Sequence, residues 1–212
     1  MPLALLHHRL RAGALLIACL NLGALQKQDD AADAARLIEM LDIRPGSTVA
    51  DVGAGPGPLV PLMSRHVGPS GRLYATDINA DRLGELRKLA TSESLPNVTV
   101  LEGAAARTNL PDGCCEAIFM RHVYHHFADP NEMNASLLRS LKPGGRLAVL
   151  DFAPTAGKSS PPGSRNEGDA HGVMAVTVIE ELKAVGFVDV REVSWPSRSV
   201  AVMARRPDSL PF

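Results

Sequence analysis

The sequence of 212 residues has no excess of basic side chains. Lysine and arginine total 22 against 23 aspartate and glutamate residues, which gives a formal net charge of −1. A nucleic-acid partner usually leaves a strongly basic patch or stripe in the sequence, and no long basic block occurs here. We therefore predict no nucleic-acid partner. The length and the hydrophobic content of 45% fit one globular domain with a sizeable core.

Cysteine is scarce. Cys19 stands alone near the N-terminus, and Cys114 and Cys115 are adjacent in the sequence. A disulfide between two neighbouring cysteines is unfavourable in geometry, and the three residues show no metal-ligand spacing. The sequence thus predicts neither a disulfide framework nor a metal site. We interpret the adjacent pair as small buried residues of a strand.

Long apolar runs are also missing. The run from Ala12 to Leu20 is too short to span a bilayer as a helix, so we expect no stable membrane span. Basic residues precede this run and small residues follow it, which gives residues 1–28 the layout of a secretory signal. Within it, "LIAC" resembles the lipobox of bacterial lipoproteins, which would place a lipid anchor on Cys19. An amphipathic N-terminal helix packing on the domain is the alternative, so export, lipid anchoring and a cytoplasmic location all stay open.

From Asp29 onward, apolar strand-like runs alternate with stretches of helical periodicity. The strands are expected at 48–53, 72–77, 97–103, 114–121 and 146–152, and the helices at 29–43, 59–66, 79–91 and 129–141. The "KPGG" at 142–145 is predicted to be a turn before the fifth strand. Strands without polar alternation, joined through helices, are typical of a parallel sheet that is covered on both faces.

The C-terminal third adds an antiparallel hairpin to this pattern. A Pro/Gly/Ser-rich stretch from Pro154 to Gly172 is predicted to be a mobile surface loop, long enough to suggest a function. A helix over 175–187 follows, and then two strands at 188–195 and 199–206 are joined by the short turn 196–198. So short a link requires antiparallel pairing. We therefore predict an α/β, Rossmann-like, doubly wound sheet of seven strands in one domain over 29–207, with a tail at 208–212.

The loop after the first strand, within "TVADVGAGPGP", indicates a ligand site. Ligands of open α/β sheets bind at the carboxyl ends of the strands, and glycines let the backbone approach a ligand closely. The dinucleotide fingerprint would need a glycine at position 58, where the sequence has Pro58. The observed pattern is an acidic residue, Asp51, followed by Gly53, Gly55 and Gly57.

This loop resembles the nucleotide loop of the class I S-adenosylmethionine-dependent methyltransferases, of the small-molecule type. Asp77 at the end of "YATD" matches the family's acidic residue for the ribose hydroxyls, and "LEGAAARTNLP" matches its adenine loop. There Ala104 replaces the usual acidic residue. "EAIFMRHVYHHF" and "LKPGGRLAVLDF" resemble the fourth and fifth strands with their loops. The resemblance implies that S-adenosyl-L-methionine is the cofactor, held by Asp51, Gly53, Ala54, Gly55, Gly57, Asp77, Ile78, Gly103, Ala104, Arg121 and His122.

The resemblance also implies methyl transfer to a small-molecule acceptor, which the sequence does not identify. The run "RHVYHHF" lies just past the fourth strand and would therefore be beside the transferable methyl group. Its histidines offer neutral bases, so we predict His125 as a general base, Tyr124 as a residue that orients the substrate, and His171 as a group closing over the acceptor. A structural role for each histidine stays open. So does a degenerate, non-catalytic member that binds the cofactor or a partner. The oligomeric state is not predicted.

Overall fold

The computed structural model describes residues 29–196 and 199–209. The predicted leader with Cys19, most of the turn at 196–198 and the end of the tail therefore lie outside the described residues. Within the described part of the chain, no helix is long and apolar enough to cross a membrane.

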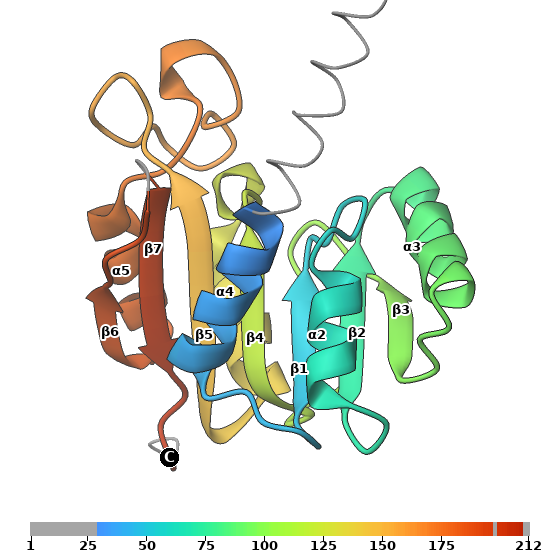
Figure 1. Cartoon of the computed structure of the whole chain (residues 1–212). Helices are drawn as coiled ribbons and strands as arrows, with labels where there is room; N and C mark the ends of the chain where they lie inside the picture. Colours follow the sequence, from blue (N-terminus) through green and yellow to red (C-terminus); the bar gives the residue numbers. More distant parts are fainter. Residues whose placement is uncertain (1–28, 197–198, 210–212) are drawn as a thin grey trace, which may run out of the picture.

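A single sheet of seven strands forms the centre of the molecule (Figure 1). Its order is β3-β2-β1-β4-β5-β7-β6. The first five strands pair in parallel, whereas β7 pairs antiparallel with both β5 and β6. The predicted fold class is thereby confirmed. The strands are β1 (Thr48–Val52), β2 (Arg72–Asp77), β3 (Val98–Glu102), β4 (Cys115–Arg121), β5 (Leu141–Phe152), β6 (Val188–Glu192) and β7 (Ser199–Arg205).

Helices cover both faces of the sheet because alternate side chains of the strands point to opposite faces. A helix over residues 29–41, α2 (Val60–Val67) and α3 (Ala80–Ser92) pack on one face through an apolar cluster that includes Leu37, Met63 and Leu86. On the other face, α4 (Pro130–Ser140) and α5 (Ala175–Ala184) pack through a cluster that includes Leu137 and Val178. The core thus consists of two layers on either side of the strands.

Several predicted boundaries were wrong, and two of them concern strands. The "KPGG" sequence is not a turn before β5 but lies inside it, where the register against β4 shifts between Cys115 and Ala117. Gly145 fits this irregularity because a Cβ atom there would lie 2.8 Å from the carbonyl oxygen of Lys142. The strand predicted over 188–195 is also shorter, because β6 ends at Glu192, three residues before the predicted end.

The adjacent cysteines also differ from the prediction. Cys115 begins β4 and is fully buried, as expected of a small strand residue. Cys114 and Cys115 are bonded to each other as a disulfide, however, although the sequence predicted no such bond. The pair lies at the amino end of β4, away from the edge at which the ligand loops gather.

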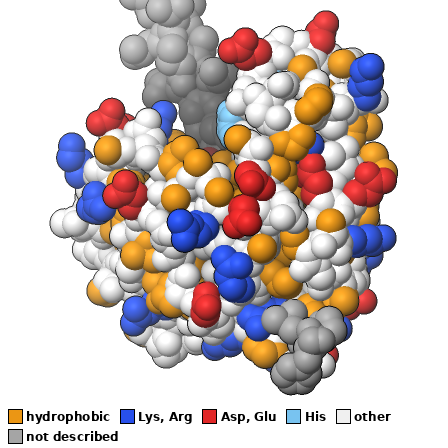
Figure 2. All heavy atoms as spheres, turned by 180° about the vertical axis from the view of Figure 1, so that it is seen from behind, with side chains coloured by type: hydrophobic (Ala, Val, Ile, Leu, Met, Phe, Trp, Pro, Cys, Tyr) orange, Lys and Arg blue, Asp and Glu red, His pale blue; other side chains and the backbone are white. Residues whose placement is uncertain are grey.

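That edge is formed by the carboxyl ends of the parallel strands. The glycine loop follows β1, and the histidine-rich "RHVYHHF" stretch follows β4, its neighbour in the sheet. The chain leaves in opposite directions from β1 and β4, which makes this the point where α/β sheets bind ligands. The segment between β5 and α5 rises above the same edge (Figure 1). On the face opposite to that view, acidic and basic side chains are mixed (Figure 2).

Candidate active site

The loop after β1 brings backbone rather than side chains to the carboxyl edge. Gly53 has a φ of +71°, which residues with a Cβ atom rarely adopt. A Cβ atom at this position would also lie 2.5 Å from Cγ2 of Val123, in the connection after β4. Only glycine therefore fits here. Gly55 also has a positive φ, +57°, but a Cβ atom there would meet no atom within 4 Å.

A pocket of about 130 Å³ opens beside this loop, at the ends of β1, β2 and β3. Five of the predicted cofactor residues line it: Gly53, Asp77, Ile78, Gly103 and Ala104. The side chain of Ile78 is 65% exposed and can cover one face of a flat ligand. The other lining residues were not among the predicted cofactor residues; they are Val52, Thr76, Ala105, Arg107, Thr108, Val123, His126, Phe127, Ala128 and Met133.

Asp77 ends β2 at this pocket. Its Oδ2 atom accepts a hydrogen bond from the N–H of Gly55 at 2.9 Å, and its Oδ1 atom accepts one from the N–H of Asn79 at 2.9 Å. These two donors fix the carboxylate next to the glycine loop. Each carboxylate oxygen can accept more than one hydrogen bond, so a diol could still donate to both.

Asp51 lies one residue before the end of β1 and is 3% exposed. Burial raises the pKa of its carboxyl to about 7, although the charge of Arg121 acts to lower it. Among the described residues, none donates a hydrogen bond to this carboxylate. The arrangement therefore fits a ligand that brings an ammonium group to Asp51.

Arg121 ends β4 and connects the sheet to the helix over 29–41. Its Nη2 atom lies 2.7 Å from Oδ1 of Asp30, and its Nη1 atom lies 2.9 Å from Oδ2 of Asp33. The indole of Trp195 donates a further hydrogen bond to Asp33 at 3.1 Å. Arg121 was predicted to hold the cofactor, and the structure places its guanidinium in this ion-pair network. Asp30 pairs with it from within the first turn of that helix.

His125 is the buried centre of a line of polar side chains. It lies in the short 3₁₀ helix η1 (Tyr124–His126) and is 1% exposed. Its Nδ1 atom lies 2.9 Å from Oδ1 of Asp151, a fully buried residue near the end of β5. Its Nε2 atom lies 3.1 Å from Nε2 of His171, which is exposed. The structure therefore brings together two of the three predicted catalytic residues.

Two more histidines and one phenylalanine complete a cluster of rings. The ring of Phe152 lies 4.9 Å from His125, 4.8 Å from His171 and 5.7 Å from His122 between centroids. His126 lies 4.0 Å from His125 and also lines the cofactor pocket. Partial burial lowers the pKa values of His122 and His126, with Arg121 adding to the effect at His122 and His125 at His126. We call these five residues the histidine cluster.

Tyr124 points away from this cluster into the core. Its hydroxyl donates to Oε2 of Glu181 at 2.9 Å and accepts from Nδ2 of Asn134 at 2.8 Å. Arg165, 2% exposed, also pairs with Glu181 at 2.6 Å. Burial raises the pKa of the Tyr124 hydroxyl. Because this side chain is fully buried and does not line the pocket, its placement does not support a role in orienting a substrate.

The remaining predicted cofactor residues support the loop. Ala54 is buried and donates its N–H to the carbonyl of Thr76 at 2.8 Å. A Cβ atom on Gly57 would lie 2.7 Å from Leu86 of α3, so this glycine allows the loop to pack on that helix. His122 has a positive φ of +58° and donates its N–H to the carbonyl of Leu150.

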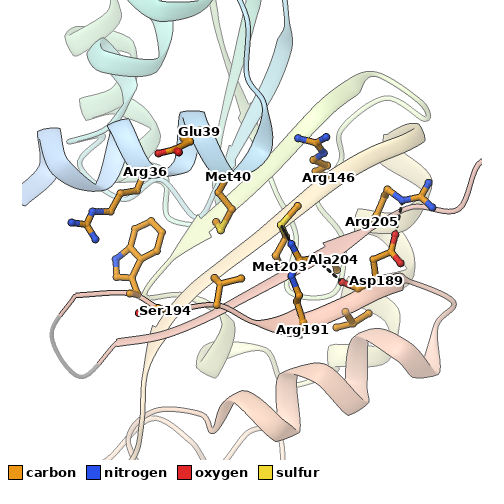
Figure 3. Close-up of a pocket in the computed structure, with 13 residues that line it drawn as sticks. Arg36, Glu39, Met40, Arg146, Asp189, Arg191, Ser194, Met203, Ala204 and Arg205 are labelled. Carbon is orange, nitrogen blue, oxygen red and sulfur yellow. Dashed lines mark hydrogen bonds and ion pairs between the residues drawn. The ribbon is translucent and has the colours of Figure 1, made fainter.

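A second hollow lies elsewhere on the molecule. This groove of about 880 Å³ lies between the helix over 29–41 and the β6–β7 hairpin (Figure 3). Met40 and Met203 lie along it, and Arg36 lies at one end (Figure 3). The guanidinium carbon of Arg36 lies 6.0 Å from the centre of the Trp195 ring, which also lines the groove. None of the predicted site residues lines this groove, and it is larger than the pocket at the carboxyl edge. We place the active site at the smaller pocket because the glycine loop, Asp77 and the histidine cluster meet there.

Comparison with known proteins identifies the region of the chain that contains this pocket. The family described as "Methyltransferase domain" matches residues 50–149, from β1 through most of β5. Residues 50–149 are a methyltransferase domain of the class I S-adenosylmethionine-dependent family. The cofactor of this methyltransferase domain is S-adenosylmethionine. Asp51 would take its ammonium, Asp77 its ribose diol and the pocket beside Ile78 its adenine.

The methyltransferase domain has curated relatives that are longer than the matched region. The chain is 37% identical over 117 residues to the ubiquinone/menaquinone biosynthesis C-methyltransferase UbiE of Pseudomonas paraeruginosa, and this alignment covers 55% of the chain and 46% of the relative. The chain is also 35% identical over 122 residues to an uncharacterized 37.1 kDa protein in transposon TN4556 of Streptomyces fradiae. This alignment covers 55% of the chain and 35% of the relative. The chain thus spans about half the length of these relatives, or less.

Solved structures resemble more of the chain. A SAM-dependent methyltransferase from Aquifex aeolicus has a TM-score of 0.69 and 27% identity, covering 82% of this chain and 89% of that chain. Geranyl diphosphate C-methyltransferase from Streptomyces coelicolor A3(2) has a TM-score of 0.68 at 16% identity, covering 82% and 75%. At that identity the second likeness shows the fold alone.

Proposed function

We propose that this chain transfers a methyl group from S-adenosylmethionine to a small-molecule nucleophile bound beside the histidine cluster. The observation that carries this proposal is the position of His126, which belongs both to the lining of the cofactor pocket and to the histidine cluster. A donor in the pocket and an acceptor at the cluster would therefore be neighbours. Methyl transfer requires such alignment of donor and acceptor, with water excluded.

Binding of the cofactor tests the first half of the proposal. Asp77→Asn keeps the size of the side chain but removes its charge, so S-adenosylmethionine should bind about 10- to 100-fold more weakly, as expected for hydrogen bonds to a charged group. Isothermal titration calorimetry measures this change. Asp81→Asn, an exposed carboxylate in the first turn of α3, is the matched control and should leave the affinity unchanged.

Transfer itself is tested by incubating the protein with methyl-labelled cofactor and a panel of phenols, thiols and amines. Labelled product that forms with the wild type and declines in Asp77→Asn supports the proposal. Cofactor binding without transfer to any acceptor in the panel would instead favour a non-catalytic, cofactor-binding protein. Equal cofactor affinity in a folded Asp77→Asn variant would show that the pocket has been assigned to the wrong ligand.

A further inference from the structure

The line Asp151–His125–His171 connects the buried core with the surface at the acceptor side. Asp151 is 0% exposed and His125 is 1% exposed, whereas His171 is exposed. The contacts are 2.9 Å from Asp151 to His125 and 3.1 Å from His125 to His171. Because the buried His125 cannot itself reach a ligand at the surface, His171 is the member of the line that an acceptor can touch.

With both imidazole rings neutral, the hydrogen bonds determine where the protons lie. The Asp151 carboxylate also accepts from the backbone N–H of His125 at 3.1 Å and from that of Phe152 at 2.9 Å, so its oxygens are surrounded by donors. Nδ1 of His125 is then the protonated nitrogen, and its Nε2 carries the lone pair. The Nε2 of His171 must consequently donate. This leaves the lone pair of His171 on Nδ1, which makes no hydrogen bond to any residue described in the structure.

His171 is held in place by a folded segment. The carbonyl of Phe152 accepts the N–H of Val173 at 3.0 Å, and the carbonyl of Arg165 accepts that of Gly172 at 3.0 Å. A Cβ atom on Gly172 would lie 2.4 Å from the carbonyl oxygen of Phe152, so the chain passes the end of β5 in close contact. The Arg165 side chain is buried against Glu181. These contacts place His171 before any acceptor binds.

We propose that His171 is the catalytic base of this methyltransferase, that His125 relays the proton, and that Asp151 is a positioning residue. The proposal rests on the proposed function and names its acceptor group, a weakly acidic hydroxyl. Nδ1 of His171 takes the hydroxyl proton while Nε2 of His171 passes its own proton to Nε2 of His125. One O–H and one N–H bond break, and two N–H bonds form. The positive charge ends on His125, beside the buried Asp151 carboxylate.

When bound, S-adenosylmethionine supplies a sulfonium-activated methyl group, and the hydroxyl oxygen takes this methyl as it loses its proton. The side chains of this protein therefore have to remove one proton per turnover from the acceptor side. A carboxylate behind an imidazole both fixes the tautomer and stabilises the imidazolium that forms. His126 lies beside the line, but the lowered pKa of its side chain makes it a weaker base than an ordinary histidine.

The first test needs no acceptor. Nuclear magnetic resonance of ¹⁵N-histidine-labelled wild type should show His125 as the Nδ1–H tautomer and His171 as the Nε2–H tautomer. In Asp151→Asn the charge is lost, and the His125 signals should move to a mixture of tautomers. An Nε2–H tautomer of His125 in the wild type would overturn the proposal. So would unchanged His125 signals in the folded Asp151→Asn protein.

The second test uses two phenols at about pH 8, where 4-methylphenol is protonated as a tyrosine side chain would be, and 4-nitrophenol is ionised. His171→Ala should reduce kcat for 4-methylphenol by about 10²- to 10⁴-fold but kcat for 4-nitrophenol by less than about threefold. Added imidazole should restore part of the activity, since His171 is exposed. Asp169→Asn, in the preceding turn, is the control and should change neither rate.

The other possible outcomes also test the roles of His171 and of the hydroxyl acceptor. Equal losses with both phenols in His171→Ala would overturn base catalysis and leave His171 a structural role. A wild type that binds S-adenosylmethionine by calorimetry but methylates neither phenol would overturn the hydroxyl acceptor. That result would leave the proposed function intact if a thiol or an amine is methylated. A wild type that does not bind the cofactor would count against the proposed function instead.

Discussion

The two sides of the carboxyl edge are built in different ways. On the side of β1 and β2, most of the residues assigned to the cofactor lie within residues 51–78, and they offer mainly backbone and the carboxylates of Asp51 and Asp77. On the side of β4 and β5, it consists of side chains from three separate stretches, which meet only in the folded chain. The cofactor side is thus a local motif, whereas the acceptor side depends on tertiary structure. The two sides touch at Gly53 and Val123.

Gly53→Ala should have the largest effect, because it should disturb both the cofactor side and the acceptor side of the carboxyl edge. The added Cβ atom would be strained at a φ of +71° and would displace Val123, for a loss of stability of about 2–5 kcal/mol. We expect at least about 100-fold weaker binding of S-adenosylmethionine where the protein still folds. Urea unfolding and calorimetry measure the two losses.

Gly55→Ala is the matched control for this contact. It carries a similar positive φ, but its Cβ atom would meet nothing within 4 Å, so it should lose only the strain of about 1–2 kcal/mol. If both variants lost the same stability, the contact with Val123 would not matter, and the two sides of the edge would be independent.

The fold was predictable because each element has its own local signal. Apolar strands, helical periodicity and Gly/Pro boundaries gave the order of the elements, and the short link before β7 gave its antiparallel pairing. "KPGG" was misassigned because its role depends on β4, whose strand continues to pair on both sides of the irregularity. No pattern within four residues distinguishes a turn from a bulge of this kind.

The site was predictable only where it is local. Asp77, which lines the pocket, could be singled out because it is a polar residue at the end of an apolar strand beside a glycine loop. Asp151 carries the same signal at the end of "RLAVLD", but its importance depends on His125, which reaches it only in the fold. The partners of Arg121 lie 88 and 91 positions earlier in the chain, too far for a sequence pattern to connect. The side chain of Tyr124 lies in the core, and not beside that of His125, because the 3₁₀ helix turns neighbouring side chains in different directions.

Cofactor binding should depend on pH through Asp51, a carboxylate on the cofactor side of the carboxyl edge. Burial raises the pKa of its carboxyl in the folded protein from 3.8 to about 7. Below pH 7 the group is therefore protonated and must release its proton before it can pair with the ammonium of the cofactor. The affinity for S-adenosylmethionine should consequently increase about tenfold between pH 6 and pH 8 and then level off.

Calorimetry across this range checks the expectation, and Asp51→Asn should bind more weakly with no such dependence. The free energy of unfolding of the cofactor-free protein should change with pH in the opposite direction. Because the raised pKa makes the folded chain bind more protons than the unfolded chain between about pH 4 and pH 7, the contribution of Asp51 to the stability of the cofactor-free protein is lost as the pH rises to 7. Cofactor affinity that did not change with pH would show that Asp51 does not contact the ammonium.

Tyr124→Phe should have the smallest effect on activity, because Tyr124 lies on the acceptor side in sequence but in the core in structure. Loss of the hydroxyl would leave Oε2 of Glu181 and Nδ2 of Asn134 with one partner fewer, in a place where Oδ1 of Asn134 already has no hydrogen-bond partner among the described residues. We expect a loss of about 1–3 kcal/mol in the free energy of unfolding, with turnover within about twofold of the wild type.

Urea unfolding and turnover on the same preparations separate the two roles of this residue. The control is Tyr74→Phe, because the hydroxyl of Tyr74 makes no hydrogen bond to the part of the chain that the structure describes. Its loss should change stability by no more than about 0.5 kcal/mol. A tenfold fall in turnover of Tyr124→Phe at unchanged stability would place this hydroxyl at the substrate. Tyr124 would then belong to the acceptor site and not to the core. A loss of stability without a loss of turnover would mean that the Tyr124 hydroxyl supports the fold only. The residues that serve the acceptor would then begin at His125.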